Sequence, residues 1–110
     1  MEPSSRVYAY LVDVMVEPDD GQFYARCLGL EGVHEAGSTP EEALAHAYDA
    51  FLSILEACLQ RGDPIPEGPH IIALRTPPDL LELKQKVRKV SRKGHAHLHT
   101  LLIPVPYALA

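Results

Sequence analysis

The first part of the chain has the nearly continuous apolar pattern that is typical of a buried β-strand. Every second residue from Tyr8 to Val16 is apolar, and most of the residues between them are apolar too, so residues 6–16 predict a strand with two largely apolar faces. Such a strand is expected near the centre of a sheet, with its second face covered by the C-terminal segment or by another subunit. Residues 18–21 (Pro-Asp-Asp-Gly) predict a turn, and residues 22–28 predict the returning strand of a hairpin.

A long helix is predicted from Thr39 onward. The Thr39 hydroxyl can cap the first turn, Pro40 fits the first helical position, and Glu42 completes a Thr-x-x-Glu capping box. Apolar residues then recur at three- and four-residue steps, which predicts one buried helical face. Gly62 and the prolines that follow it predict that the helix ends near Arg61.

Beyond residue 69 the pattern predicts a strand, a second helix and a last strand. Residues 70–75 predict a short strand, and residues 76–79 (Thr-Pro-Pro-Asp) predict a helix start. This helix is expected to end near Ser91, and its apolar stripe consists of Leu80, Leu83, Val87 and Val90. Residues 95–105 predict a strand closed by prolines.

The order of these signals resembles the N-terminal domain of the HicB family of antitoxins over residues 8–67. The resemblance is carried by the Asp-Gly hairpin, the Leu-x-Gly corner within residues 28–33, the Gly-Ser-Thr-Pro-Glu-Glu-Ala helix start at residues 37–43 and the Gly-Asp-x-Ile-Pro exit at residues 62–66. It implies a three-stranded antiparallel sheet packed on one helix with a further strand after it, a fold likened to a pared-down RNase H domain. It also implies binding and silencing of a small RNA-cleaving toxin of the HicA type.

The predicted fold is α+β, with a small three- to four-stranded antiparallel sheet packed on one long helix (β-β-β-α-β), followed by a shorter basic helix and a C-terminal strand. With 110 residues the chain is expected to form one domain, in which residues 1–69 are the HicB-like core and residues 70–110 an extension of it. Cys27 and Cys58 are expected to be small core residues without a disulfide. No apolar run matches the length of a membrane span and no signal peptide is evident, so the protein is expected in the cytoplasm.

Charge divides the chain into two parts. Residues 1–69 hold three arginines against 13 acidic residues, a net charge of −10, whereas residues 70–110 hold seven basic and two acidic residues, a net charge of +5. Three uses of this asymmetry remain open: the basic part folds back on an acidic body, the acidic part receives a basic partner such as a toxin, or the basic part contacts nucleic acid. The carboxylates expected on turns and at the helix start, where a toxin would contact them, are Asp19, Asp20, Glu31, Glu35, Glu41 and Glu42.

An alternative function is a nucleic-acid-binding regulator that uses the basic segment. Its basic side chains are Lys84, Lys86, Arg88, Lys89, Arg92 and Lys93. In most HicB-family members a separate C-terminal DNA-binding domain represses the operon, and this chain departs from them. A helix-turn-helix and a ribbon-helix-helix each need two helices, and residues 70–110 predict one, so neither motif is complete. Toxin binding is therefore the expected role, and DNA or RNA binding is the alternative.

The last strand carries a row of histidines at His95, His97 and His99, about 7 Å apart at each step of two residues. Neutral imidazoles at this spacing can bind a metal, but neither a fourth ligand nor a supporting carboxylate is evident. We expect instead an exposed polar strand face. The residues expected to point inward from the same strand are Leu98, Thr100 and Leu102. No metal or other cofactor is predicted.

An enzyme is not predicted either. An RNase H-type active site needs several carboxylates that converge on metal ions, and the candidates near a shared sheet surface are Asp13 with Asp49 or Glu56. The favoured roles of Asp13 are a charge at a strand edge or an ion pair with Arg26 on the next strand.

A third class of function is an orphan scaffold that self-associates through the apolar second face of residues 7–15. A charged residue in place of Leu11 would separate this hypothesis from the others, because it would dissociate an oligomer built on that face. Self-association and toxin binding are compatible, and the resemblance implies a homo-oligomer, a dimer or a tetramer.

Overall fold

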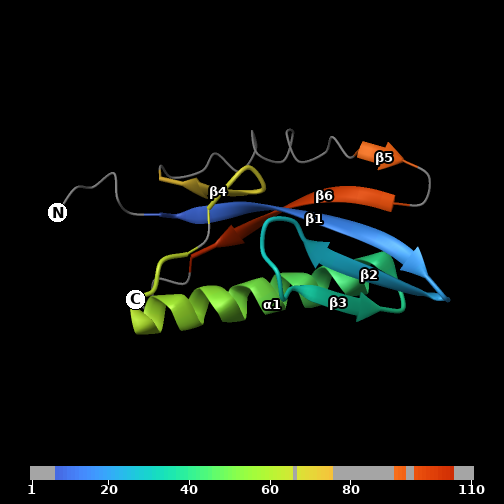
Figure 1. The fold of residues 1–110 in the computed structure, drawn as a ribbon, viewed down its shortest axis with the longest axis horizontal. Helices are drawn as coiled ribbons and strands as arrows, with labels where there is room; N and C mark the ends of the chain where they lie inside the picture. The colour runs from blue at the N-terminus through green and yellow to red at the C-terminus, as the bar shows by residue number, and fades with distance from the viewer. Residues whose placement is uncertain (1–6, 66, 76–90, 94–95, 106–110) are drawn as a thin grey trace.

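The computed structural model describes residues 7–65, 67–75, 91–93 and 96–105. These residues form one antiparallel sheet of six strands with a long helix against one of its faces (Figure 1). In chain order the elements are β1 (Ala9–Asp19), β2 (Gln22–Cys27), β3 (His34–Gly37), α1 (Pro40–Arg61), β4 (Ile71–Leu74), β5 (Ser91–Lys93) and β6 (Ala96–Pro104). The predicted α+β class, an antiparallel sheet packed on one helix, is confirmed.

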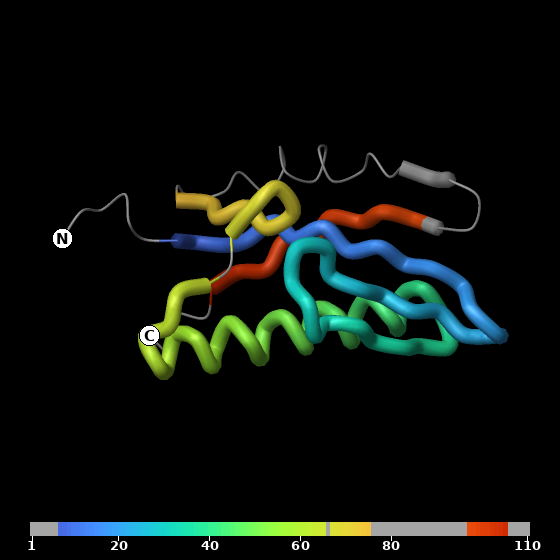
Figure 2. Tube along the Cα trace, viewed as in Figure 1, coloured from blue at the N-terminus to red at the C-terminus, as the bar shows by residue number. Residues whose placement is uncertain are grey.

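The sheet is built around β1, as its apolar pattern predicts. On one side, β1 pairs with β4 through its first residues and with β2 through its last residues, while β6 pairs with most of its other side. The strand order is β3-β2-β1-β6-β5, and β4 lies beside β1 in line with β2. Figure 2 shows that β1 and β6 run together although they come from opposite ends of the chain.

Helix α1 begins and ends where the sequence predicts. Thr39 is the N-cap, and its hydroxyl oxygen accepts a hydrogen bond from the backbone N–H of Glu42 at 3.1 Å. The Glu42 carboxylate accepts hydrogen bonds from the backbone N–H and the hydroxyl of Ser38, each at 3.2 Å. Gly62 closes the helix in the left-handed conformation (φ 73°) and donates its N–H to the carbonyl of Cys58.

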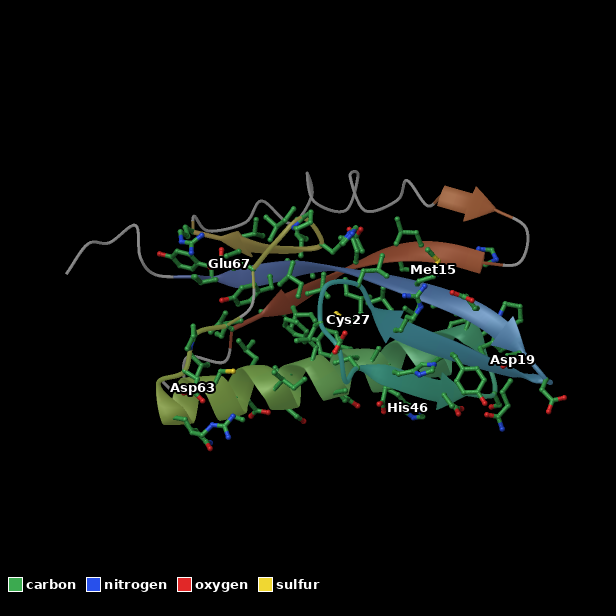
Figure 3. The ribbon with its side chains drawn as sticks, viewed as in Figure 1. Met15, Asp19, Cys27, His46, Asp63 and Glu67 are labelled. Atoms are coloured by element: carbon green, nitrogen blue, oxygen red, sulfur yellow. The ribbon has the colours of Figure 1, made fainter. Side chains whose placement is uncertain are left out.

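The core lies between α1 and one face of the sheet, called here the helix face; the opposite side is the second face. From β1 the core receives Tyr10, Val12, Val14 and Val16, and from α1 it receives Ala43, Ala47, Phe51, Leu55 and Cys58. Cys27 also points into this layer (Figure 3). Both cysteines are buried and free, as predicted. Tight packing extends to the backbone, because a Cβ atom on Gly37 would lie 2.4 Å from the backbone nitrogen of Ala43.

The histidines of β6 lie on the face opposite to the predicted one. His97 pairs with Val16 and His99 with Val14, and directly paired residues of an antiparallel sheet point to the same side, so both rings lie on the helix face. The residues of β6 on the second face are Leu98, Thr100 and Leu102. The prediction was wrong because the residues on both faces of this strand include leucines, so the apolar pattern alone does not show which face is buried. Ile103 lies on the same face of β6 as His97 and His99, and it is the fully buried residue that fixes the register.

The predicted second helix falls mostly outside the described residues, which resume at Ser91. Ser91, where that helix was expected to end, begins β5, and Arg92 and Lys93 belong to the same strand. Strand β5 pairs with β6 and was not predicted. His95 also lies outside the described part of the chain. Within the described ranges, no helix combines the length and the apolar character that a membrane crossing requires.

Candidate functional site

Four of the six carboxylates predicted to contact a partner gather at one end of the molecule. Gly37 at the end of β3 pairs with Phe23, and Phe23 pairs with Pro18, so the chain enters α1 level with the β1–β2 turn. Figure 1 shows the turn and the start of α1 at the same end. The four exposed carboxylates at this acidic end are Asp19, Asp20, Glu41 and Glu42.

The other two predicted carboxylates lie elsewhere. Glu35 is on β3, half-buried, and pairs with Ala25 on the helix face. Glu31 is exposed in the loop between β2 and β3, at the far end of β2 from the turn, which corresponds to about 20 Å of strand. The structure therefore does not join all six into one surface. Within the acidic end, Glu42 already serves as a cap for α1 through its hydrogen bonds to Ser38.

A pocket of about 340 Å³ opens on the second face beside this acidic end. Its lining residues are Glu17, Pro18, Asp19, Tyr24, Arg26 and His34. Glu17 pairs with Tyr24 across β1 and β2, and Arg26 pairs with His34 across β2 and β3, so these four side chains point to the same side. The rings of Tyr24 and His34 lie with their centres 5.5 Å apart. The pocket thus combines two carboxylates, one guanidinium and two rings.

Asp13 lies between the part of β1 that pairs with β4 and the part that pairs with β2. Its backbone N–H donates to the carbonyl of His70 at 2.9 Å, and its carbonyl accepts from the N–H of Leu28 at 2.9 Å. On the second face, one carboxylate oxygen accepts a hydrogen bond from the Thr100 hydroxyl at 2.9 Å, and the other lies 3.0 Å from Nδ1 of His70. The Asp13 side chain therefore links β1 to β6 through Thr100 and to the residue before β4 through His70.

The predicted ion pair between Asp13 and Arg26 is wrong. Arg26 instead donates to Glu17 at 3.5 Å. Arg26 stands opposite Met15, so Asp13 and Glu17 are equally near to it along β1, but the Asp13 carboxylate is already bonded to Thr100 and His70. Nor does the structure bring Asp13 near Asp49 or Glu56. Those two residues belong to α1 on the helix face, and the sheet separates them from the Asp13 carboxylate. Among the described residues, no group of three or more His, Cys, Asp or Glu side chains is placed to hold a metal ion.

His99 on β6 has a pKa that its surroundings shift. Burial lowers its pKa from the usual 6.5, and the neighbouring His97 lowers it further, while the Glu41 carboxylate acts in the opposite direction. The two imidazole rings lie with their centres 6.3 Å apart. His99 therefore holds its proton less firmly than a free imidazole does, and Glu41 at the start of α1 is close enough to act on it.

The residues of the nucleic-acid alternative are mostly not placed. Lys84, Lys86, Arg88 and Lys89 lie outside the described residues, so that prediction stays a prediction. Arg92 and Lys93 lie on β5, an outer strand of the sheet, rather than on a helix.

Searches of the chain against protein-family models, curated proteins and solved structures find no match. Sequence reasoning missed Glu17, Tyr24 and His34 as parts of one pocket. An available signal was the alternation of Tyr24 and Arg26 with the apolar Ala25 and Cys27, which places the first two on the side away from the core.

Proposed function

We propose that this protein is an antitoxin-type binding module that neutralises a small RNA-cleaving toxin of the HicA type. The proposal is supported by the resemblance of residues 8–67 to HicB-family antitoxins and by a fold of the kind that this resemblance implies. The observation that carries it is the acidic end, where the β1–β2 turn and the start of α1 present Asp19, Asp20, Glu41 and Glu42 together.

Charge provides the physical basis for partner choice. A protein that binds RNA exposes lysines and arginines to the phosphates, and a carboxylate-rich surface on another protein competes for those cations. Bound at the acidic end, this protein would cover the basic surface of the toxin and keep RNA from its catalytic group. Neutralisation is then steric and electrostatic, and requires no chemistry from the antitoxin.

The proposal includes a cytoplasmic location and a homo-oligomer. Self-association through the second face is the arrangement to test, because Leu11 and Met15 are only half-buried and Ile72 is 49% exposed on that face. Sedimentation velocity on the wild type and on Leu11→Glu distinguishes the cases. Loss of the larger species by a variant that keeps its circular dichroism spectrum supports association through this face, and an unchanged sedimentation coefficient contradicts it.

The central experiment is a pull-down from the native cell with the tagged protein, at moderate salt, with and without nuclease. We expect a small basic protein in near-stoichiometric amount that survives the nuclease and is identified by mass. The captured protein is then assayed for RNA cleavage with and without added antitoxin, and we expect the addition to abolish cleavage. Recovery of nucleic acid alone, or of this chain alone, contradicts the proposal.

A matched pair of variants tests the role of the acidic end. Asp19→Asn/Asp20→Asn removes two charges there, whereas Asp63→Asn/Glu67→Gln removes two exposed charges at the other end of the molecule (Figure 3). Glu42 is left intact because it caps α1. We expect only the first variant to weaken capture and inhibition. Equal weakening by both would indicate a general effect of net charge.

A further inference from the structure

The pocket on the second face has a composition suited to one kind of guest. Glu17 and Asp19 supply two carboxylates at its rim, and Tyr24 and His34 supply adjoining rings. A carboxylate attracts a cation and accepts its N–H donors, and the face of a tyrosine ring attracts a cation as well. Its volume of about 340 Å³ is near the lower limit for small-molecule sites, so it has room for one long side chain.

The cation already present in the pocket is loosely held. Arg26 Nη2 lies 3.5 Å from Glu17 Oε1, at the long limit of a hydrogen bond, and the two side chains are 54% and 48% exposed. Ion pairs of this kind contribute little net stability, because solvent screens them and both side chains lose freedom. By contrast, Arg61 lies 3.1 Å from Asp63 at the end of α1. The Glu17 carboxylate is therefore available for exchange with another cation.

We propose that this pocket binds one arginine or lysine side chain of the basic partner protein. The incoming cation replaces Arg26 at Glu17, approaches Asp19 and packs against the ring of Tyr24. The net charge of −10 on residues 1–69 favours such a partner over an anionic one. The identity of the partner rests on the proposed function, but the affinity of the pocket for a guanidinium does not.

The test is an NMR titration of the ¹⁵N-labelled protein with the blocked peptide acetyl-Gly-Arg-Gly-amide. The control peptide contains citrulline, which keeps the shape of arginine without its charge. We expect saturable shifts at residues 17–19, 24, 26 and 34 with the arginine peptide and none with the citrulline peptide. Absence of saturable shifts at these residues with the arginine peptide overturns the proposal.

Two variants are expected to shift the affinity for the arginine peptide in opposite directions, and a distant control distinguishes a local effect from a general effect of net charge. Glu17→Gln is expected to lower the affinity for the arginine peptide about fivefold, which is the factor for loss of one half-exposed ion pair. Arg26→Gln is expected to raise the affinity for the arginine peptide, because the guanidinium that competes for Glu17 is gone. The matched control is Glu67→Gln, which removes the partner of an exposed arginine at a distant site and is expected to change nothing. A weaker Arg26→Gln complex contradicts the exchange.

The outcomes separate this inference from the proposed function. If the peptide binds as described but no basic protein is captured from the cell, the cation site stands and the antitoxin proposal fails. If a basic protein is captured and Glu17→Gln binds it as well as the wild type, the antitoxin proposal stands and this pocket is not its anchor. Asp19→Asn removes the other carboxylate of the pocket and can be tested in the same peptide titration.

Discussion

The Thr100 hydroxyl donates a hydrogen bond of 2.9 Å to the Asp13 carboxylate, joining two residues that are 87 positions apart in the chain. The two residues also pair directly across β1 and β6. The second carboxylate oxygen of Asp13 lies 3.0 Å from the imidazole of His70, just before β4. One polar side chain thus fastens β6 and the entry to β4 to the central strand.

Asp13→Ala is expected to destabilise the protein by about 1–3 kcal/mol, because two half-buried hydrogen-bond partners lose their acceptor. Urea unfolding followed by circular dichroism gives the free energy of unfolding. The control is Asp63→Ala, which removes an exposed carboxylate paired with Arg61 and is expected to cost less than about 1 kcal/mol. Equal losses in the two variants would show that the Asp13 contacts carry no special weight.

Gly37→Ala is expected to destabilise the fold by about 1–3 kcal/mol, as overpacking does. The added Cβ would lie 2.4 Å from the backbone nitrogen of Ala43, and backbone atoms at a helix start cannot move aside like a flexible side chain. Gly68→Ala is the control, since its Cβ meets nothing within 4 Å. Thermal unfolding of the two variants should separate them, and an unchanged melting temperature for Gly37→Ala would contradict the close approach.

Cys27 is expected to react slowly with thiol reagents while the protein is folded. Burial raises the pKa of its thiol from 9.0 to about 11, and the Asp13 carboxylate adds to the rise. At pH 8 the thiolate population is then about 100-fold lower than for the free thiol, and alkylation should slow accordingly. Iodoacetamide labelling of Cys58→Ala, in buffer and in urea, measures this ratio. Equal rates in the two solvents would contradict it.

The same shift predicts a loss of stability in alkali. The unfolded chain releases the Cys27 proton near its ordinary pKa of 9.0, before the folded protein does near about 11, so the free energy of unfolding falls between these values. The free energy of unfolding of Cys27→Ala, measured by urea unfolding at pH values in this range, should fall less steeply with pH than that of the wild type.

On the acid side, His99 gives a slope of the opposite sense. Burial and the neighbouring His97 lower the pKa of His99, so the unfolded chain takes up a proton near pH 6.5 before the folded protein does. The contribution of His99 to stability is therefore present above 6.5 and is lost as pH falls toward the lower folded value. His99→Gln should unfold with a flatter pH dependence below 6.5, and an unaltered profile would show that His99 is not responsible.

Local signals in the sequence predicted those elements that depend on neighbouring residues. Thr39, Pro40 and Gly62 set the limits of α1 through capping and the left-handed turn, and these interactions span only a few residues. The face of β6 was not predictable in the same way, because both of its residue sets are partly apolar. Only pairing with Val14 and Val16 of β1, across the whole chain, assigns the histidines to the helix face.

The candidate site follows the same division. The turn at Asp19 and the helix start at Glu41 were each predictable from turn and capping residues. Their position at the same end of the molecule depends on the β2–β3 register, which turn residues do not predict. The pocket depends also on the β1–β2 register, which places Arg26 opposite Met15 and within reach of Glu17.

The position of β6 beside β1 also bears on how the chain is made. A ribosome adds Ala9 before Pro104 and before all of the residues between them, although these two residues are sheet partners. During synthesis the central strand therefore keeps one apolar-rich edge open, a state prone to pairing with other chains. Closure of the sheet awaits β6, so folding should be slow for a protein of this size.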